Sequence, residues 1–116
     1  MSVEIYDYNG EGYKAVMRYG AWRVAYLNHA DRFKEENLVR IERHNETDEV
    51  FVLLEGEATL VIGEALEKMP MEPYRIYNVT KGTWHHILTK EKTRVLIVEN
   101  EDTSLENSDY MEVKKG

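Results

Sequence analysis

The chain has 116 residues, no cysteine and a formal charge of −7 at pH 7, from 22 acidic and 15 basic residues. This length suits one domain with its own core, and the lack of cysteine excludes disulfides and thiolate chemistry. The acidic balance argues against a nucleic-acid partner. Apolar runs of about five residues are too short for a membrane span. Residues 1–4 lack the features of a secretory signal, so we expect a cytoplasmic protein.

The first third of the chain predicts short strands separated by turns. Residues 3–8 alternate apolar and polar side chains and fit an edge strand, whereas residues 14–19 are ambiguous between strand and loop. Residues 21–27 form a stronger strand pattern, with Trp22, Val24 and Tyr26 on one face. The polar segment 28–36 has room for one helical turn.

The rest of the chain continues the strand pattern. Residues 63–73 predict a wide hairpin loop, because two prolines prevent a long helix there. The segment 101–116 is mainly polar, so we expect a single barrel domain over 1–100 and a loosely docked C-terminal tail. The predicted strands of this part are 38–44, 50–54, 58–62, 75–79, 84–88 and 94–99.

Seven to nine short strands, with turn signals every 8 to 12 residues or so, indicate an all-β sandwich or barrel. Both faces of residues 50–54 are apolar, which is typical of a strand covered on both sides. In a chain this short, a second subunit can supply one of the covers. We therefore expect a homodimer.

Metal-competent side chains gather near residue 44. Glu42 and His44 are two apart and share a face of one strand. The turn-forming segment 45–48 would bring Glu49 back beside His44 on the next strand. The spacing thus predicts three potential ligands around one point.

Two segments resemble the motifs of the cupin superfamily, small jelly-roll β-barrels also known as double-stranded β-helices. The first motif has two His two apart, then Glu, then Gly after six residues. The second is Pro-x-Gly-x-x-His, and the matched core covers residues 41–99. Residues 47–56 are particularly similar to small single-domain cupins. The motif positions are occupied here by Glu42, His44, Glu49 and Gly56, and by Thr80, Gly82 and His85.

The resemblance implies a divalent metal inside the barrel. His44, Glu49 and His85 fall on three of the family's four ligand positions, and Glu42 occupies the fourth in place of the usual His. Two imidazoles and two carboxylates favour Mn²⁺, Fe²⁺ or Zn²⁺. The implied function is an enzyme acting on a small polar or anionic metabolite. The alternatives are a non-catalytic small-molecule binder and a metal-free structural barrel, and no residue outside the ligand set stands out as a nucleophile or base.

Neighbouring positions complete the predicted site. Phe51 and Ile87 share strand faces with Glu49 and His85, so we expect them in the wall of the substrate pocket. His86 is expected to point outward, and the alternative is that it replaces His85 as ligand. We expect a solvated His29 and turn-forming roles for Glu46 and Asp48. Trp22, Tyr26, Tyr77 and Trp84 are expected in the core, with the pocket lining as the alternative.

Overall fold

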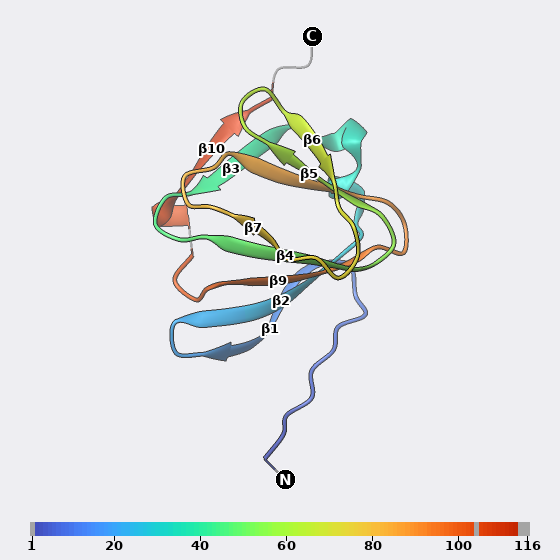
Figure 1. Cartoon of the computed structure of the whole chain (residues 1–116), viewed down its shortest axis with the longest axis vertical. Helices are drawn as coiled ribbons and strands as arrows, with labels where there is room; N and C mark the ends of the chain where they lie inside the picture. The colour runs from blue at the N-terminus through green and yellow to red at the C-terminus, as the bar shows by residue number, and fades with distance from the viewer. Residues whose placement is uncertain (1, 104, 114–116) are drawn as a thin grey trace.

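The computed structural model describes residues 2–103 and 105–113, which form two facing five-stranded β-sheets (Figure 1). All strand ladders are antiparallel. In spatial order the first sheet contains β1 (Gly12–Tyr19), β2 (Trp22–Asn28), β9 (Arg94–Asn100), β4 (Glu49–Glu55) and β7 (Tyr77–Val79). The second sheet contains β10 (Ser108–Glu112), β3 (Arg40–His44), β8 (His85–Thr89), β5 (Ala58–Ile62) and β6 (Glu67–Pro70).

The described residues contain no α-helix, and the only helical elements are three 3₁₀ turns. These are η1 (Asp31–Phe33), η2 (Glu35–Asn37) and η3 (Leu105–Asn107). The first two confirm the expected helical turn between the second and third strands. Phe33 is the buried residue of η1 and packs into the main core. None of the described helices is long and apolar enough to span a membrane.

Strand alternation builds the core between the two sheets. On β2, β4 and β9 alternate side chains point inward, and the apolar ones among them are removed from water there. This core includes Leu27, Phe51, Leu53, Val95, Ile97, Leu60 and Ile87, each at most 5% exposed. The predicted all-β jelly-roll barrel is confirmed.

The opposite face of the first sheet is also apolar. Cross-strand pairing forms one row from Val24, Val98 and Val50, and a second row from Tyr26, Leu96 and Val52. All six side chains are only partly buried. We call these six residues the outer face.

The prediction of an edge strand at residues 3–8 is wrong. This segment has no strand pairing, and it runs away from the barrel as an extended arm (Figure 1). Val3 and Ile5 are 67% and 90% exposed. The base of the arm is held where Arg94 Nη2 donates to Asp7 Oδ1 and to the Tyr8 carbonyl, both at 2.7 Å. Alternation alone therefore did not make a strand, because no sheet edge lies beside the arm to accept its hydrogen bonds.

Two other segments gain a strand that the sequence did not predict. The expected wide loop at 63–73 contains β6, which pairs with β5 from Thr59↔Pro70 to Ile62↔Glu67. The expected loose tail contains β10, which pairs with β3 over five residues. Both lie at sheet edges, where pairing with a single neighbour tolerates proline and polar side chains.

Candidate functional site

A cavity of about 500 Å³ lies between the sheets. All six residues predicted for the site line it, namely Glu42, His44, Glu49, Phe51, His85 and Ile87. Strand pairing brings them together from distant parts of the chain. The pair Glu42↔His85 joins β3 to β8, and the pair Glu49↔Glu99 joins β4 to β9. Their side chains face inward because each occupies an inward position of its strand's alternation.

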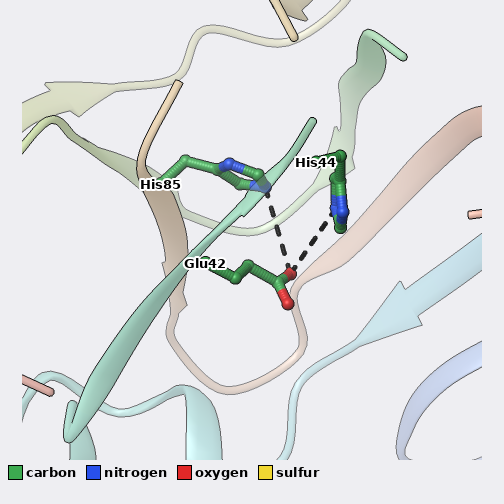
Figure 2. Close-up of side chains that lie close together, drawn as sticks. All are labelled: Glu42, His44 and His85. Atoms are coloured by element: carbon green, nitrogen blue, oxygen red, sulfur yellow. Dashed lines mark ion pairs between the residues drawn. The ribbon is translucent and has the colours of Figure 1, made fainter. Parts of the chain in front are cut away.

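The two histidines converge on one carboxylate. Glu49 Oε1 lies 3.1 Å from His44 Nε2 and 3.1 Å from His85 Nε2. Glu42 Oε1 is 3.9 Å and 4.0 Å from the same two nitrogens (Figure 2). The side chains of His44, Glu49 and His85 are 10%, 8% and 4% exposed, whereas Glu42 is 38% exposed. The potential ligand atoms of Glu42, His44 and His85 all lie within 4.8 Å of one another.

The other nitrogen of each imidazole is also held. His85 Nδ1 is 2.9 Å from the Thr83 carbonyl oxygen, and His44 Nδ1 is 2.8 Å from Ser108 Oγ. A carbonyl oxygen only accepts hydrogen bonds, so His85 Nδ1 carries the proton. In a neutral His85 ring, the Nε2 lone pair therefore faces the Glu49 carboxylate. Two such acceptors 3.1 Å apart require a positive charge between or beside them, either a proton or a metal ion.

Burial and charge pairing have opposite effects on the pKa values of the cluster. Burial works against protonation of both imidazoles, but the hydrogen bond and charge of Glu49 outweigh it and raise the pKa of His44 and of His85. Burial likewise disfavours the ionised Glu49, and the hydrogen bonds from the two rings reverse this effect and lower the pKa of Glu49. The site thus favours an ionised carboxylate beside a cation.

Solved structures with the same architecture are known, although neither a family model nor a curated protein sequence matches the chain. A cupin-2 domain containing protein from Shewanella frigidimarina is 18% identical, with a TM-score of 0.60 over 81% of this chain and 85% of that one. A cupin superfamily protein from Desulfitobacterium hafniense is 19% identical, with a TM-score of 0.60 over 86% and 84%. Streptomyces Pac13, described as a nucleoside dehydratase, is 8% identical, with a TM-score of 0.65 over 93% and 85%.

This protein has the cupin fold. The likeness to the superfamily that its two motifs suggested is confirmed at the level of the fold. The motif residues Glu42, His44, Glu49 and His85 lie on β3, β4 and β8, the strands that surround the cluster.

The cupin barrel also contains a buried carboxylate that the sequence reasoning missed. Glu99 is 6% exposed and hydrogen-bonds Glu49, while its Oε1 accepts bonds from the Tyr13 hydroxyl at 2.5 Å and from Arg23 Nη2 at 2.8 Å. Burial, followed by the charge of Glu49, raises the pKa of Glu99. The potential ligand atoms of His44, Glu49 and Glu99 also lie within 4.8 Å of one another. A lone Glu on the inward face of an otherwise apolar strand was the available signal.

Phe51, Ile87 and Asp48 have the surroundings that the sequence suggested. Phe51 and Ile87 line the cavity, and the Phe51 ring is 6.0 Å from that of His85. Asp48 is a turn residue that accepts hydrogen bonds from Asn78 Nδ2 and the Lys81 amide.

Two histidines are less exposed than expected. His86 is half-buried, its ring centroid lies 6.4 Å from that of Phe33, and its buried Nε2 has no hydrogen-bond partner among the described residues. Burial, followed by the charges of His85 and Arg32, lowers the pKa of His86 to about 4. His29 is also half-buried, with Nδ1 2.7 Å from Thr89 Oγ1. The 3₁₀ turn η1, which follows β2, packs against β8 here, a contact that strand alternation does not predict.

The four aromatic residues expected in the core do not line the cavity. Trp22 is 43% exposed, and Tyr26 lies on the outer face. Trp84 packs in a second cluster with Arg43 above its ring, and Tyr77 packs against the main core. The aromatic side chains of the cavity are instead those of Tyr13, Phe33, Phe51 and Tyr110.

Proposed function

We propose that this cupin barrel binds a divalent metal ion, Mn²⁺, Fe²⁺ or Zn²⁺, through Glu42, His44, Glu49 and His85, and acts as an enzyme on a small polar or anionic metabolite. The observation that carries this proposal is the contact of His85 Nε2 with Glu49 at 3.1 Å while Nδ1 donates to a carbonyl. That arrangement leaves two lone pairs facing each other, and a metal ion bound by both would satisfy them. Imidazole and carboxylate are the donor types that these metals prefer.

The residues around the cluster have separable tasks under this proposal. A metal held here would supply Lewis-acid chemistry or an activated water. Ser108 and the Thr83 carbonyl orient the two imidazoles, as outer-shell partners of metal ligands commonly do. Phe51 and Ile87 form an apolar wall that keeps bulk water from the substrate. Glu99, held by Tyr13 and Arg23, can exchange a proton with Glu49.

Metal content tests this proposal directly. Elemental analysis and calorimetric titration with Mn²⁺, Fe²⁺ and Zn²⁺ should find one ion per chain in the wild-type protein and none in the His44→Ala variant. The His29→Ala variant is the matched control, because His29 hydrogen-bonds Thr89 and does not line the cavity. A wild-type protein that binds none of these ions, while folded, would refute the metal site.

A second candidate function is acid–base catalysis without a metal. A proton on the Nε2 atom of each imidazole also satisfies the contacts to Glu49, and burial of the cluster would strengthen proton transfer to a ligand. Pac13 is a cupin-fold protein described as a nucleoside dehydratase. A dehydratase eliminates water, so we suggest testing this chain for an elimination reaction. Turnover by metal-free protein that survives chelator treatment would favour this candidate. Binding of a metabolite without turnover would instead indicate a non-catalytic binding protein.

We further propose a homodimer that forms through the outer face. Val24, Val50 and Val98 form one apolar row, and the parallel row of Tyr26, Leu96 and Val52 extends it across three strands. A contiguous apolar patch on a sheet is typical of a surface that another protein covers. A second copy presents the same patch and makes a self-complementary interface. A cytoplasmic location also stays a prediction.

Sedimentation analysis tests the dimer. The wild-type chain should sediment at twice the monomer mass, and Leu96→Glu should sediment as a monomer with an unchanged circular dichroism spectrum. Thr59→Glu, on β5 of the other sheet, is a matched control that should leave the dimer intact. A wild-type monomer at all accessible concentrations would contradict the interface.

A further inference from the structure

The arginines of this chain fall into two groups. Five of the seven form an ion pair with a carboxylate, and these are Arg18, Arg23, Arg43, Arg75 and Arg94. Within residues 2–103 and 105–113, no such ion pair involves Arg32 or Arg40. In a chain with a formal charge of −7, two arginines without a carboxylate partner are notable, and both line the cavity.

Each of these two guanidinium groups lies on an aromatic ring. Arg32 Cζ is 4.6 Å from the centre of the Phe33 ring, and Arg40 Cζ is 4.4 Å from that of Tyr110. Stacking of this kind restrains a guanidinium plane and leaves its N–H groups free at the edges. Those donors are arranged to bind a planar carboxylate or a phosphate with two parallel hydrogen bonds.

The two arginines lie at the open end of the cavity, which we call the mouth. The exposed lining residues that define the mouth are Arg32, Asn37, Val39, Arg40 and Tyr110. Arg40, Glu42 and His44 are alternate residues of β3 and share its inward face. Exposure falls along this line, since Arg40 is exposed, the Glu42 side chain is 38% exposed and the His44 side chain is 10% exposed. At ~3.3 Å per residue, the backbone of Arg40 is ~13 Å from that of His44.

Charge changes sign between the mouth and the buried end. Arg32 and Arg40 contribute positive charge at the mouth, whereas Glu42, Glu49 and Glu99 contribute carboxylates farther in. A negatively charged group would be attracted at the mouth and repelled at the buried carboxylates. The cavity therefore has a preferred orientation for a ligand that is charged at one end.

We propose that the mouth is an oxyanion site, in which Arg32 and Arg40 bind the carboxylate or phosphate of an elongated small molecule whose uncharged, oxygen-bearing end reaches His44, Glu49 and His85. The orientation of the inner end rests on the proposed function. The anion site at the mouth does not, because neither arginine is a potential metal ligand.

Titration with simple oxyanions tests the site. Inorganic phosphate and acetate are added separately to the full-length chain at constant ionic strength, and NMR shifts of the arginine side-chain and backbone N–H groups are followed. We expect saturable shifts at Arg32 and Arg40. Arg32→Gln and Arg40→Gln should each weaken binding about tenfold, the effect of losing one charge-assisted hydrogen-bonded pair. A stronger response to phosphate would identify a phosphate ester as the ligand class, and a stronger response to acetate a carboxylic acid.

Matched variants distinguish anion binding at the mouth from nonspecific attraction to positive charge and from metal binding. Arg75→Gln removes the same charge from an exposed arginine that pairs with Glu72 outside the cavity, and should bind both anions like the wild type. His44→Ala should lose metal and keep the anion response, whereas Arg40→Gln should keep metal. Unsaturable shifts in the wild type, or equal losses in Arg40→Gln and Arg75→Gln, would overturn the oxyanion site. Absence of metal with an intact anion response would overturn only the proposed function.

Discussion

At the scale of single residues, His44 is held from two sides. Its Nε2 contacts Glu49, and its Nδ1 contacts Ser108 Oγ at 2.8 Å. Ser108 lies directly opposite His44 in the pairing of β10 with β3. A strand outside the sequence motifs therefore supplies this contact. Under the proposed function, Ser108 is a positioning residue that acts through the imidazole.

Ser108→Ala should weaken metal binding without unfolding the protein. Loss of an outer-shell partner typically lowers metal affinity by about 10- to 100-fold. Calorimetric titration with Zn²⁺ measures this effect. Ser108→Thr keeps the hydroxyl and should restore most of the affinity. Equal affinities for the wild type and the alanine variant would show that Ser108 does not orient the ring.

Arg23 and Glu99 should be strongly coupled in stability. Their side chains are 17% and 4% exposed, and Arg23 Nη2 lies 2.8 Å from Glu99 Oε1. Removing Arg23 leaves the buried Glu99 carboxyl with the Tyr13 hydroxyl but without its cation, and breaking a buried ion pair commonly costs about 3 to 5 kcal/mol. We expect Arg23→Met to lower the free energy of unfolding in urea by about 3 kcal/mol. The double variant with Glu99→Gln should recover part of that loss, and strictly additive effects would contradict the coupling.

At the scale of the elements, one glycine determines how β4 turns into β5. Gly56 has φ +83°, and a Cβ at this position would lie 2.4 Å from Thr93 Oγ1 and 2.5 Å from the Thr93 Cα. The turn at Gly56 therefore packs directly against the loop that precedes β9. This loop and the turn between β4 and β5 are joined through Thr93 Oγ1, which accepts from the Glu57 amide at 2.9 Å. The position is thus restricted by both backbone conformation and space.

Gly56→Ala should destabilise the barrel severely. The new methyl group must displace backbone atoms, so we expect a loss of more than about 3 kcal/mol in the free energy of unfolding. Gly63→Ala is the matched control, because Gly63 has φ +78° but no atom within 4 Å of its Cβ position. This control should lose only about 1 kcal/mol. Chemical denaturation of both variants measures the difference, and similar losses would show that crowding at Thr93 is unimportant.

At the scale of the whole molecule, the closed barrel creates an interior in which several ionisable groups are kept from water. Taken as whole residues, His44, Glu49, His85 and Glu99 are each at most 8% exposed. Burying such groups is costly unless each is paired. The buried cluster therefore lowers the free energy of unfolding unless a cation pairs with its carboxylates. A bound metal would raise the stability of the entire fold.

A divalent metal should consequently raise the melting temperature. At a free metal concentration 100 times the dissociation constant, binding to the folded state contributes about 2.7 kcal/mol, which corresponds to roughly 10 °C in a domain of this size. The shift should disappear with EDTA and be absent in His44→Ala. Scanning calorimetry measures it. A melting temperature that does not respond to any of the three metals would agree with the metal-free candidate.

The sequence by itself determined those features that depend on neighbours in the chain. Strand alternation placed Glu42 and His44 on one face, and the turn-forming residues before Glu49 returned that side chain to the same point. The resemblance added His85 and the barrel. The placement of Glu42, His44 and Glu49 was predicted correctly because the period of a strand and the chemistry of a turn are local properties.

Only the tertiary structure decided which distant strands are neighbours. Glu99 meets Glu49, Tyr13 and Arg23 through strand register, and nothing within a few residues of Glu99 specifies that register. The arm at residues 3–8 has a strand's alternation but no adjacent edge, whereas β10 has a polar sequence and does find one. A strand exists only where a second strand accepts its hydrogen bonds, so its presence depends on the closed fold as much as on its own residues.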